Sequence, residues 1–258
     1  MGLLRDQLYL YPHLRVIIAS ATIDFNSFLT YFYPNLSNDI KLFENTDLRK
    51  FNYYTSGRKI PFVYSEGRRF PIIKHFWGED FAFTDDTGKE KVDEILPNWW
   101  KKISGGNGQI PTRDQLPNTI TELVQELCKY LDAIKEPVDD KSHILVFLPG
   151  SHEINKTVSM IRALKMDDVV VFPLYAQRPL DEQEEALKPD PQKHKDTYGK
   201  RRIVISTNVA ETSLTVEGVR YVIDSGYIKA SYWNPYLQVS ELQTLPHSKS
   251  GVRQRWGR

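Results

Sequence analysis

The sequence predicts an α/β fold in which helices flank a parallel β-sheet. The first observation behind this prediction is that short apolar runs alternate with longer helical segments over the second half of the chain, which is the pattern of βαβ units. The second is that small polar residues follow several of these runs, as they do where parallel sheets bind ligands at the carboxyl ends of their strands. We therefore expect one sheet covered by helices, with a site at its carboxyl edge.

The elements of this sheet follow from periodicity and from helix-capping residues. Each expected strand is a short apolar run, and each expected helix repeats apolar residues at helical spacing. Helices are expected over residues 119–134, 151–164 and 180–187, and strands over residues 143–148, 169–172, 202–205 and 220–223.

The first half of the chain carries weaker signals. We expect a buried strand over residues 14–19, a helix from Asp24 to about Tyr33, and strand pieces at residues 62–64 and 70–73. Pro71 confines the last of these to a sheet edge or a strand start. Residues 78–117 are rich in turn-forming residues, so we expect a surface insertion with one helix near residues 91–103.

Composition bounds the class of protein. The 258 residues exceed the usual domain of about 100–200 residues, which allows one core and a smaller piece. No apolar run approaches the roughly 20 residues of a membrane span, and we expect no secretory signal, because charged residues follow the first four residues at once. The single cysteine, Cys128, excludes an internal disulfide and suits an intracellular, cytoplasmic location. The net charge of +1 gives no global argument for nucleic-acid binding.

Three strand ends combine small and polar residues. They are residues 20–22 (Ser-Ala-Thr), 148–151 (Leu-Pro-Gly-Ser) and 206–215 (STNVAETSLT). Gly150 permits close backbone approach, and Ser151 is expected to cap the following helix, whose free first-turn amides suit a phosphate. Taken singly, each segment is also what an ordinary turn or helix cap contains.

In their order along the chain, these segments resemble the motifs of the DEAH-box branch of superfamily 2 nucleic-acid helicases. Motif III resembles "SATID", motif IV "ILVFLPGSHEI", motif IVa "PLYAQRPLDEQ", motif V "STNVAETSLT", and the first part of motif VI "QRWGR". The stretch between motifs V and VI is similar to the family's, including its β-hairpin. The resemblance does not extend to residues 78–117.

This resemblance implies two RecA-like domains, with ATP between them and single-stranded nucleic acid across both. Residues 1–24 would end the first domain, and residues 25–61 would be the connecting segment to the second. Residues 62–258 would form the second domain, a RecA-like parallel sheet with the hairpin and the insertion. The parent would be a 3'–5' RNA helicase that binds ATP and Mg²⁺ through both domains. RNA, the other domains of the parent and protein activators would be its partners, with no membrane.

The chain alone is not expected to hydrolyse ATP, because its sequence contains neither a GxxxxGK[ST] loop nor a DEAH-like tetrad. By resemblance, Gln254 lies near the attacking water and Arg258 is the first arginine finger. The residues implied to bind nucleotide are Ser213, Thr215 and Glu217. Those implied to contact RNA are Gly150, Ser151, Thr207 and Asn208, and those implied to couple the domains are Ser20, Ala21 and Thr22. We expect no protein metal ligands.

Departures from the family pattern affect three places. Ala176 and Gln177 stand where motif IVa usually has small Ser or Gly residues, and Leu187 stands where many members place an aromatic against adenine. Trp256 fills a position usually held by a small residue. We therefore expect no hydroxyl contact from Ala176 and Gln177, and only weak base stacking at Leu187, because leucine has no π-face.

Three alternatives stay open at this stage. The chain could be a RecA-like scaffold module that no longer couples ATP to movement, or another nucleotide-dependent enzyme on a doubly wound sheet. The latter is disfavoured because no glycine-rich dinucleotide fingerprint is present. The hairpin aromatics could stack on bases, although packing of the hairpin on the sheet is favoured. These aromatics are Tyr227, Tyr232, Trp233 and Tyr236.

Overall fold

The computed structural model of the chain describes most of its second half and parts of its first. The described residues are 2–11, 13–18, 28, 31–32, 53–55, 58–60, 72, 83–84, 90–91, 111–138, 142–188, 199–212 and 214–258. Contacts divide the chain into two compact units, Met1–Pro71 and Ile72–Arg258.

The described part of the first unit includes helix α1 and one strand pair. Helix α1 spans Gly2–Leu10, and β1 (Tyr53–Thr55) pairs antiparallel with β2 (Arg58–Ile60). The Arg5 guanidinium lies 5.1 Å from the centre of the Tyr31 ring, within cation–π range.

The second unit is built on a four-stranded parallel sheet with the order β6-β7-β5-β8. Its strands are β5 (His143–Phe147), β6 (Val169–Leu174), β7 (Arg201–Ser206) and β8 (Val219–Asp224). Its helices are α4 (Leu116–Ala133), α5 (Ser151–Ala163), α6 (Leu180–Leu187), α7 (Val209–Thr212) and α8 (Lys249–Trp256).

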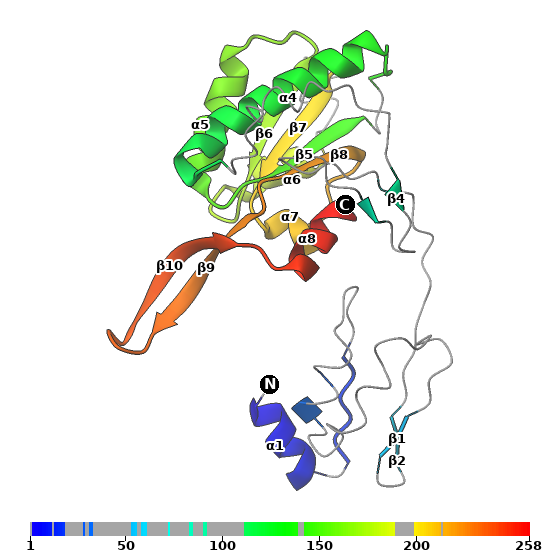
Figure 1. Cartoon of the computed structure of the whole chain (residues 1–258), viewed down its shortest axis with the longest axis vertical. Coiled ribbons are helices and arrows are strands. Elements are labelled where there is room, and N and C mark those ends of the chain that lie inside the picture. Colours follow the sequence, from blue (N-terminus) through cyan, green and yellow to red (C-terminus); the bar gives the residue numbers. More distant parts are fainter. Residues whose placement is uncertain are drawn as a thin grey trace. The chain divides into compact units, whose positions relative to one another are not determined.

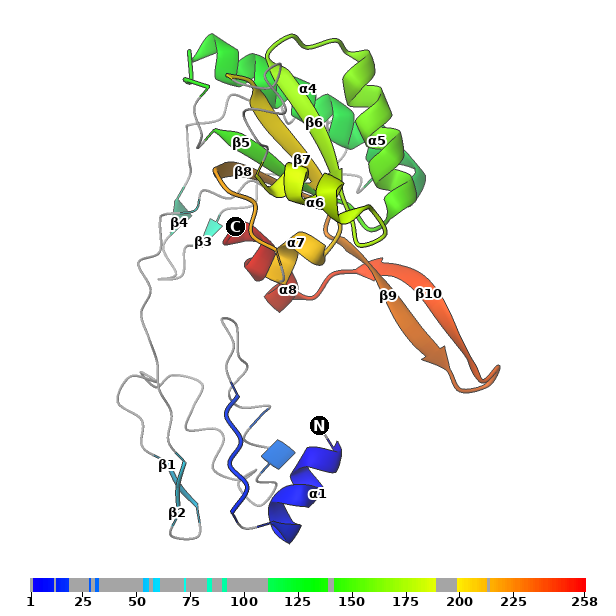
Figure 2. The same cartoon turned by 180° about the vertical axis from the view of Figure 1, so that it is seen from behind.

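Alternation along the strands places two apolar cores on opposite faces of this sheet. Ile144 and Ile203, paired in neighbouring strands, belong to the core under α4 and α5. Leu145 and Val204 belong to the other core, which includes Ala186 of α6 and residues of α7. Both faces are thus covered (Figures 1 and 2), which explains why the central strands are continuous apolar runs.

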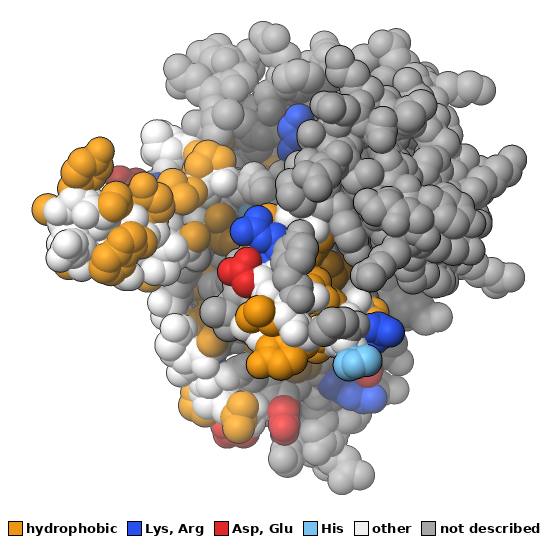
Figure 3. All heavy atoms as spheres, turned by 90° about the horizontal axis from the view of Figure 1, so that it is seen from below, with side chains coloured by type: hydrophobic (Ala, Val, Ile, Leu, Met, Phe, Trp, Pro, Cys, Tyr) orange, Lys and Arg blue, Asp and Glu red, His pale blue; other side chains and the backbone are white. Residues whose placement is uncertain are grey.

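Strands β9 (Tyr227–Asn234) and β10 (Val239–Pro246) form a separate antiparallel hairpin. The hairpin projects away from the sheet (Figures 1 and 2). The space-filling view shows apolar side chains gathered on it (Figure 3). Trp233 is 57% exposed and Tyr236 95% exposed, so the favoured prediction that the hairpin packs on the sheet is wrong. Of the four aromatics, only Tyr227, at the base, packs against a core.

The predicted parallel sheet with flanking helices and a hairpin is confirmed. All four predicted strands of the second half form, with ends shifted by one or two residues. Helix α4 begins at Leu116, inside the region expected to be an insertion. Leu116 and Pro117 are buried, and the preceding 3-10 turn η4 (Arg113–Gln115) carries a capping box from Thr112 to Gln115.

Other expectations for the first half are wrong or lie outside the described residues. Residues 14–18 form no strand, and Ile17 is 93% exposed, because no described segment pairs with them to complete a ladder. Lys91 lies in strand β4 (Glu90–Lys91), which pairs with β3 (Phe83–Thr84), and not in a helix. Residues 28, 31 and 32 are helical as expected. The predicted segments 62–64 and 92–103 lie outside the described residues, as does 70–73 except Ile72, which is in no strand.

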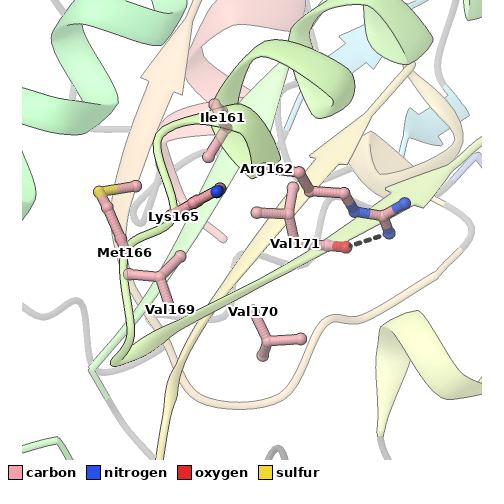
Figure 4. A pocket seen from close by; sticks show the side chains of 7 residues that line it. All are labelled: Ile161, Arg162, Lys165, Met166, Val169, Val170 and Val171. Atoms are coloured by element: carbon pink, nitrogen blue, oxygen red, sulfur yellow. Dashed lines mark hydrogen bonds between the residues drawn. The ribbon is translucent and has the colours of Figure 1, made fainter.

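The sheet edge at β6 is protected by its own side chains. The Arg162 guanidinium donates to the Val171 carbonyl at 2.8 Å, and Pro173 has no N–H to offer a partner strand. A cavity of about 190 Å³ lies beside this bond, lined by Ile161, Met166 and Val169 among others (Figure 4). It lies at the amino ends of the strands, away from the carboxyl edge. No described helix has the length and apolar character needed to cross a membrane.

Candidate functional site

The carboxyl edge of the sheet brings two predicted RNA-contacting segments together. Phe147, at the end of β5, is paired with Ser206, at the end of β7. The Leu148 amide donates to the Ser206 carbonyl at 2.9 Å. The loops that continue from these strands, 148–150 and 207–208, therefore start side by side, as expected for a ligand-binding edge.

Gly150 is the N-cap of α5, and no side chain caps that helix. The prediction that Ser151 is the cap is wrong, because Ser151 is the first helical residue and its side chain is exposed. A Cβ on Gly150 would lie 2.8 Å from Glu153 Oε2 and 3.5 Å from Lys229 Nζ. Packing against Glu153 is thus one reason for glycine here. The first-turn amides of α5, apart from that of Glu153, which bonds the Glu153 carboxylate, remain suited to a phosphate.

Glu153 is a buried carboxylate beneath this loop. Its Oε1 accepts from Arg113 Nε at 2.7 Å, while its Oε2 is buried without a hydrogen-bond partner. Burial acts to raise the pKa of the Glu153 carboxyl, but hydrogen bonds from Arg113 and from the Glu153 backbone amide, with the charges of Arg113 and Lys229, hold that pKa below its usual value. The carboxylate is therefore ionised at neutral pH and accompanied by two cations.

Thr207 and Asn208 form the turn that leads from β7 into α7. The Thr207 amide donates to the Leu174 carbonyl at 3.2 Å, and its hydroxyl lies 3.5 Å from the Val209 amide. Thr207 is half-buried and Asn208 is exposed. Ser213 and the predicted coupling residues Ser20, Ala21 and Thr22 lie outside the described residues.

Arg202 connects two positions that the resemblance assigns to the nucleoside. Its Nη1 donates to the Leu187 carbonyl at 3.0 Å and its Nη2 to the Glu217 carbonyl at 2.6 Å. The Glu217 carboxylate is exposed and lies 3.4 Å from Lys188 Nζ. Thr215 is also exposed. One buried guanidinium thus fixes the end of α6 beside the segment before β8.

Gln254 and Arg258 lie on and just after α8, whose N-cap is Ser248 with its hydroxyl accepting from the Gly251 amide at 3.1 Å. Both side chains are half-buried. The Arg258 guanidinium donates to the main-chain carbonyl of Glu211 on α7. The predicted finger is therefore held against the helix that follows the Thr207–Asn208 turn.

A buried ionic cluster joins α7, β8 and α8. Glu211 Oε2 accepts from Arg255 Nε at 3.1 Å and lies 2.9 Å from His247 Nε2. Arg255 Nη1 donates to Asp224 Oδ1 at 2.7 Å and to the Tyr227 carbonyl at 3.1 Å. Its guanidinium lies 4.8 Å from the centre of the Phe147 ring.

Sequence reasoning missed this cluster. Glu211 and Arg255 both stand inside the quoted motifs, but no local pattern pairs residues 44 positions apart. The sequence offered one signal, which is that these charged residues stand among small or apolar neighbours. A charged side chain that is buried requires a partner. Within the part of the chain that the structure describes, no group of three or more His, Cys, Asp or Glu is arranged to hold a metal ion.

One family model and several known proteins are similar to parts of this chain. The family model described as "Helicase conserved C-terminal domain" matches residues 122–258. ATP-dependent RNA helicase HrpA of Borreliella burgdorferi is 38% identical over 129 residues, which are 50% of this chain and 15% of that protein. Two crystal structures of E. coli HrpB, one titled a DExH-box NTPase and one a DEAH/RHA helicase, each show 29% identity and a TM-score of 0.44, over 57% of this chain and 16% of theirs. The chain thus corresponds to about 15% of the length of this HrpA relative.

Proposed function

Because this chain belongs to the helicase conserved C-terminal domain family, we propose that it is the second RecA-like domain of a DEAH-box, 3'–5' ATP-dependent RNA helicase. The observation that carries the proposal is the side-by-side start of the 148–150 and 207–208 loops at the carboxyl edge. This edge is where sheets of this kind bind ligands. The similarity to HrpA, named an ATP-dependent RNA helicase, supports the same reaction.

In this proposal, main-chain amides and small polar side chains hold the RNA backbone. The first-turn amides of α5 after Gly150, with Ser151, Thr207 and Asn208, would contact phosphates. Such contacts position a strand without reading its sequence. Arg113 and Lys229, both close to Glu153, offset the negative charge of that carboxylate near the proposed RNA path.

The nucleotide would be shared with the first RecA-like domain of the parent. ATP with Mg²⁺, when bound, supplies the phosphoanhydride whose hydrolysis drives movement along RNA. Arg202, near the amino end of β7, holds the Leu187 and Glu217 main chains with a single guanidinium. These positions therefore lie at the other end of the parallel strands from the 148–150 and 207–208 loops. Thr215 and Glu217 would contact the nucleoside, and Ser213 the γ-phosphate region.

Gln254 would orient the attacking water, and Arg258 would stabilise charge on the transferred phosphoryl group. An arginine in that role contributes about 10³–10⁵ in rate in related NTPases. Because a guanidinium has five N–H groups, Arg258 can bond a phosphate while it keeps its bond to the Glu211 carbonyl. Because the chain contains no phosphate-binding GxxxxGK[ST] loop, catalysis would require the first domain of the parent.

The decisive experiment is RNA-stimulated ATP hydrolysis by the parent protein. Ser213→Ala and Arg258→Ala should reduce turnover strongly, with Arg258→Ala approaching the roughly 10³-fold lower bound for an arginine finger, while RNA affinity stays close to wild type. Arg253→Ala, at an exposed arginine of the same helix, is the matched control and should retain activity. Unwinding of duplexes with 3' or 5' overhangs tests polarity. A wild-type parent that hydrolyses no ATP with any nucleic acid would instead favour a RecA-like scaffold.

A further inference from the structure

Glu211 forms bonds to several parts of the candidate site. Its carboxylate receives Arg255 and His247, and its main-chain carbonyl receives Arg258. Its amide donates to the Asn208 carbonyl at 3.0 Å. One residue therefore touches the proposed RNA-contacting turn on one side and the finger on the other.

The side of this cluster that faces β8 and β9 is anchored to the sheet. Arg255, whose side chain is 1% exposed, bonds Asp224 and the Tyr227 carbonyl and lies over the Phe147 ring. Removing either partner of a buried ion pair leaves an uncompensated charge. Helices α7 and α8 are adjacent in both views (Figures 1 and 2). The ionic cluster therefore holds them together, since breaking any one of its ion pairs would leave a buried charge without a partner.

His247 also contacts Glu211, and its ring packs closely against Gly251 of α8. A Cβ on Gly251 would lie 2.1 Å from His247 Nε2, so the imidazole fits only against a glycine at that position of α8. The same imidazole lies 2.9 Å from Glu211 Oε2. The start and the end of α8 are thus both tied to Glu211.

We propose that Glu211 is a positioning residue that transmits RNA binding at the Thr207–Asn208 turn to α8, and so to Gln254 and Arg258. This inference rests on the proposed function, since it requires RNA at that turn. A phosphate that draws Asn208 outward shifts the carbonyl that receives the Glu211 amide. The bonds of Glu211 to His247, Arg255 and Arg258 then carry that shift to α8, so Arg258 moves with the RNA-contacting turn.

Hydrogen–deuterium exchange of the 258-residue chain, with and without saturating oligouridine RNA, tests the proposal. In the wild type, RNA should slow amide exchange at residues 207–212 and also at residues 249–256, the latter by at least about fivefold, as expected for an ordinary coupling free energy. In Glu211→Gln, RNA should still slow exchange at residues 207–208 but leave residues 249–256 unchanged. If Glu211 had only a structural role, Glu211→Gln would speed exchange at residues 249–256 by the same factor with and without RNA.

Glu136→Gln is the matched control, because Glu136 also pairs with an arginine, Arg220, at 2.7 Å, but at the amino end of β8. It should keep the effect of RNA on residues 249–256. If Glu211→Gln does not fold, Arg255→Lys, which keeps the buried charge, should uncouple α8 in the same way. If RNA slows exchange in α8 equally in the wild type and in a folded Glu211→Gln or Arg255→Lys variant, the inference is overturned, but the proposed RNA contacts are not. No RNA binding by the wild type would overturn both the inference and the proposed RNA contacts.

Discussion

Arg255 and Glu211 form an ion pair across the candidate site, with Nε and Oε2 3.1 Å apart and both side chains buried. Asp224 shares the guanidinium through Nη1 at 2.7 Å. Arg255 Nη2 and Asp224 Oδ2 are nevertheless buried without hydrogen-bond partners. Desolvation of these groups offsets much of their attraction, so the cluster is better suited to fixing the relative position of α7 and α8 than to adding stability.

Removing one partner of this cluster should still be strongly destabilising. Arg255→Gln would leave Glu211 and Asp224 buried without their shared cation, and breaking such a pair costs about 3–5 kcal/mol. The free energy of unfolding, measured by urea denaturation of the chain, should fall by that amount. Arg253→Gln, at an exposed position on the same helix, should change it by less than about 0.5 kcal/mol. Equal effects of the two substitutions would contradict a buried network.

Gly251 is predicted to tolerate no side chain. A Cβ there would meet the His247 ring at 2.1 Å, whereas a Cβ on Gly257 would meet nothing closer than 3.6 Å. Gly251→Ala should therefore displace the imidazole from Glu211 and destabilise the chain by about 1–3 kcal/mol, the usual effect of overpacking. Gly257→Ala should be nearly neutral. Thermal unfolding of the two variants makes the comparison, and a neutral Gly251→Ala would show that the His247–Glu211 contact contributes little.

The Glu153–Arg113 pair predicts a pH dependence of stability. The folded-state pKa of Glu153 is lowered, so the ionised carboxylate stabilises the fold at pH values above its unfolded pKa. That contribution is lost as the pH falls through the lowered folded pKa. Arg113→Gln should raise the folded pKa and flatten the acid-side slope of the free energy of unfolding against pH. An unchanged slope in this variant would show that Arg113 does not hold the pKa down.

Sequence alone predicted the sheet well and the site in part. The strands of the second half are buried on both faces, so continuous apolar runs identify them without ambiguity. The place of Gly150, Thr207 and Asn208 at the carboxyl edge could be predicted, because strand ends and motif resemblance depend on neighbours in the sequence. Their contact with RNA stays a prediction. The Glu211–Arg255 pair and the Arg202 bonds to Leu187 and Glu217 were missed, because they are set by tertiary packing between distant segments. The exposed hairpin was also misjudged, since aromatic strand residues do not show whether a third layer covers them.

That exposed hairpin gives a final prediction about RNA. Trp233 is 57% exposed on β9, and Leu242 lies nearby on the same face of β10 and is 63% exposed. If Trp233 stacks on a base, Trp233→Ala should weaken RNA binding by about 1–3 kcal/mol, as measured by fluorescence anisotropy, with little change in the free energy of unfolding. Leu242→Ala removes apolar surface from the same face but no ring, so it should leave affinity nearly unchanged. Because stacking requires a π-face and general apolar contact does not, equal losses in the two variants would indicate an apolar docking surface and not a base platform.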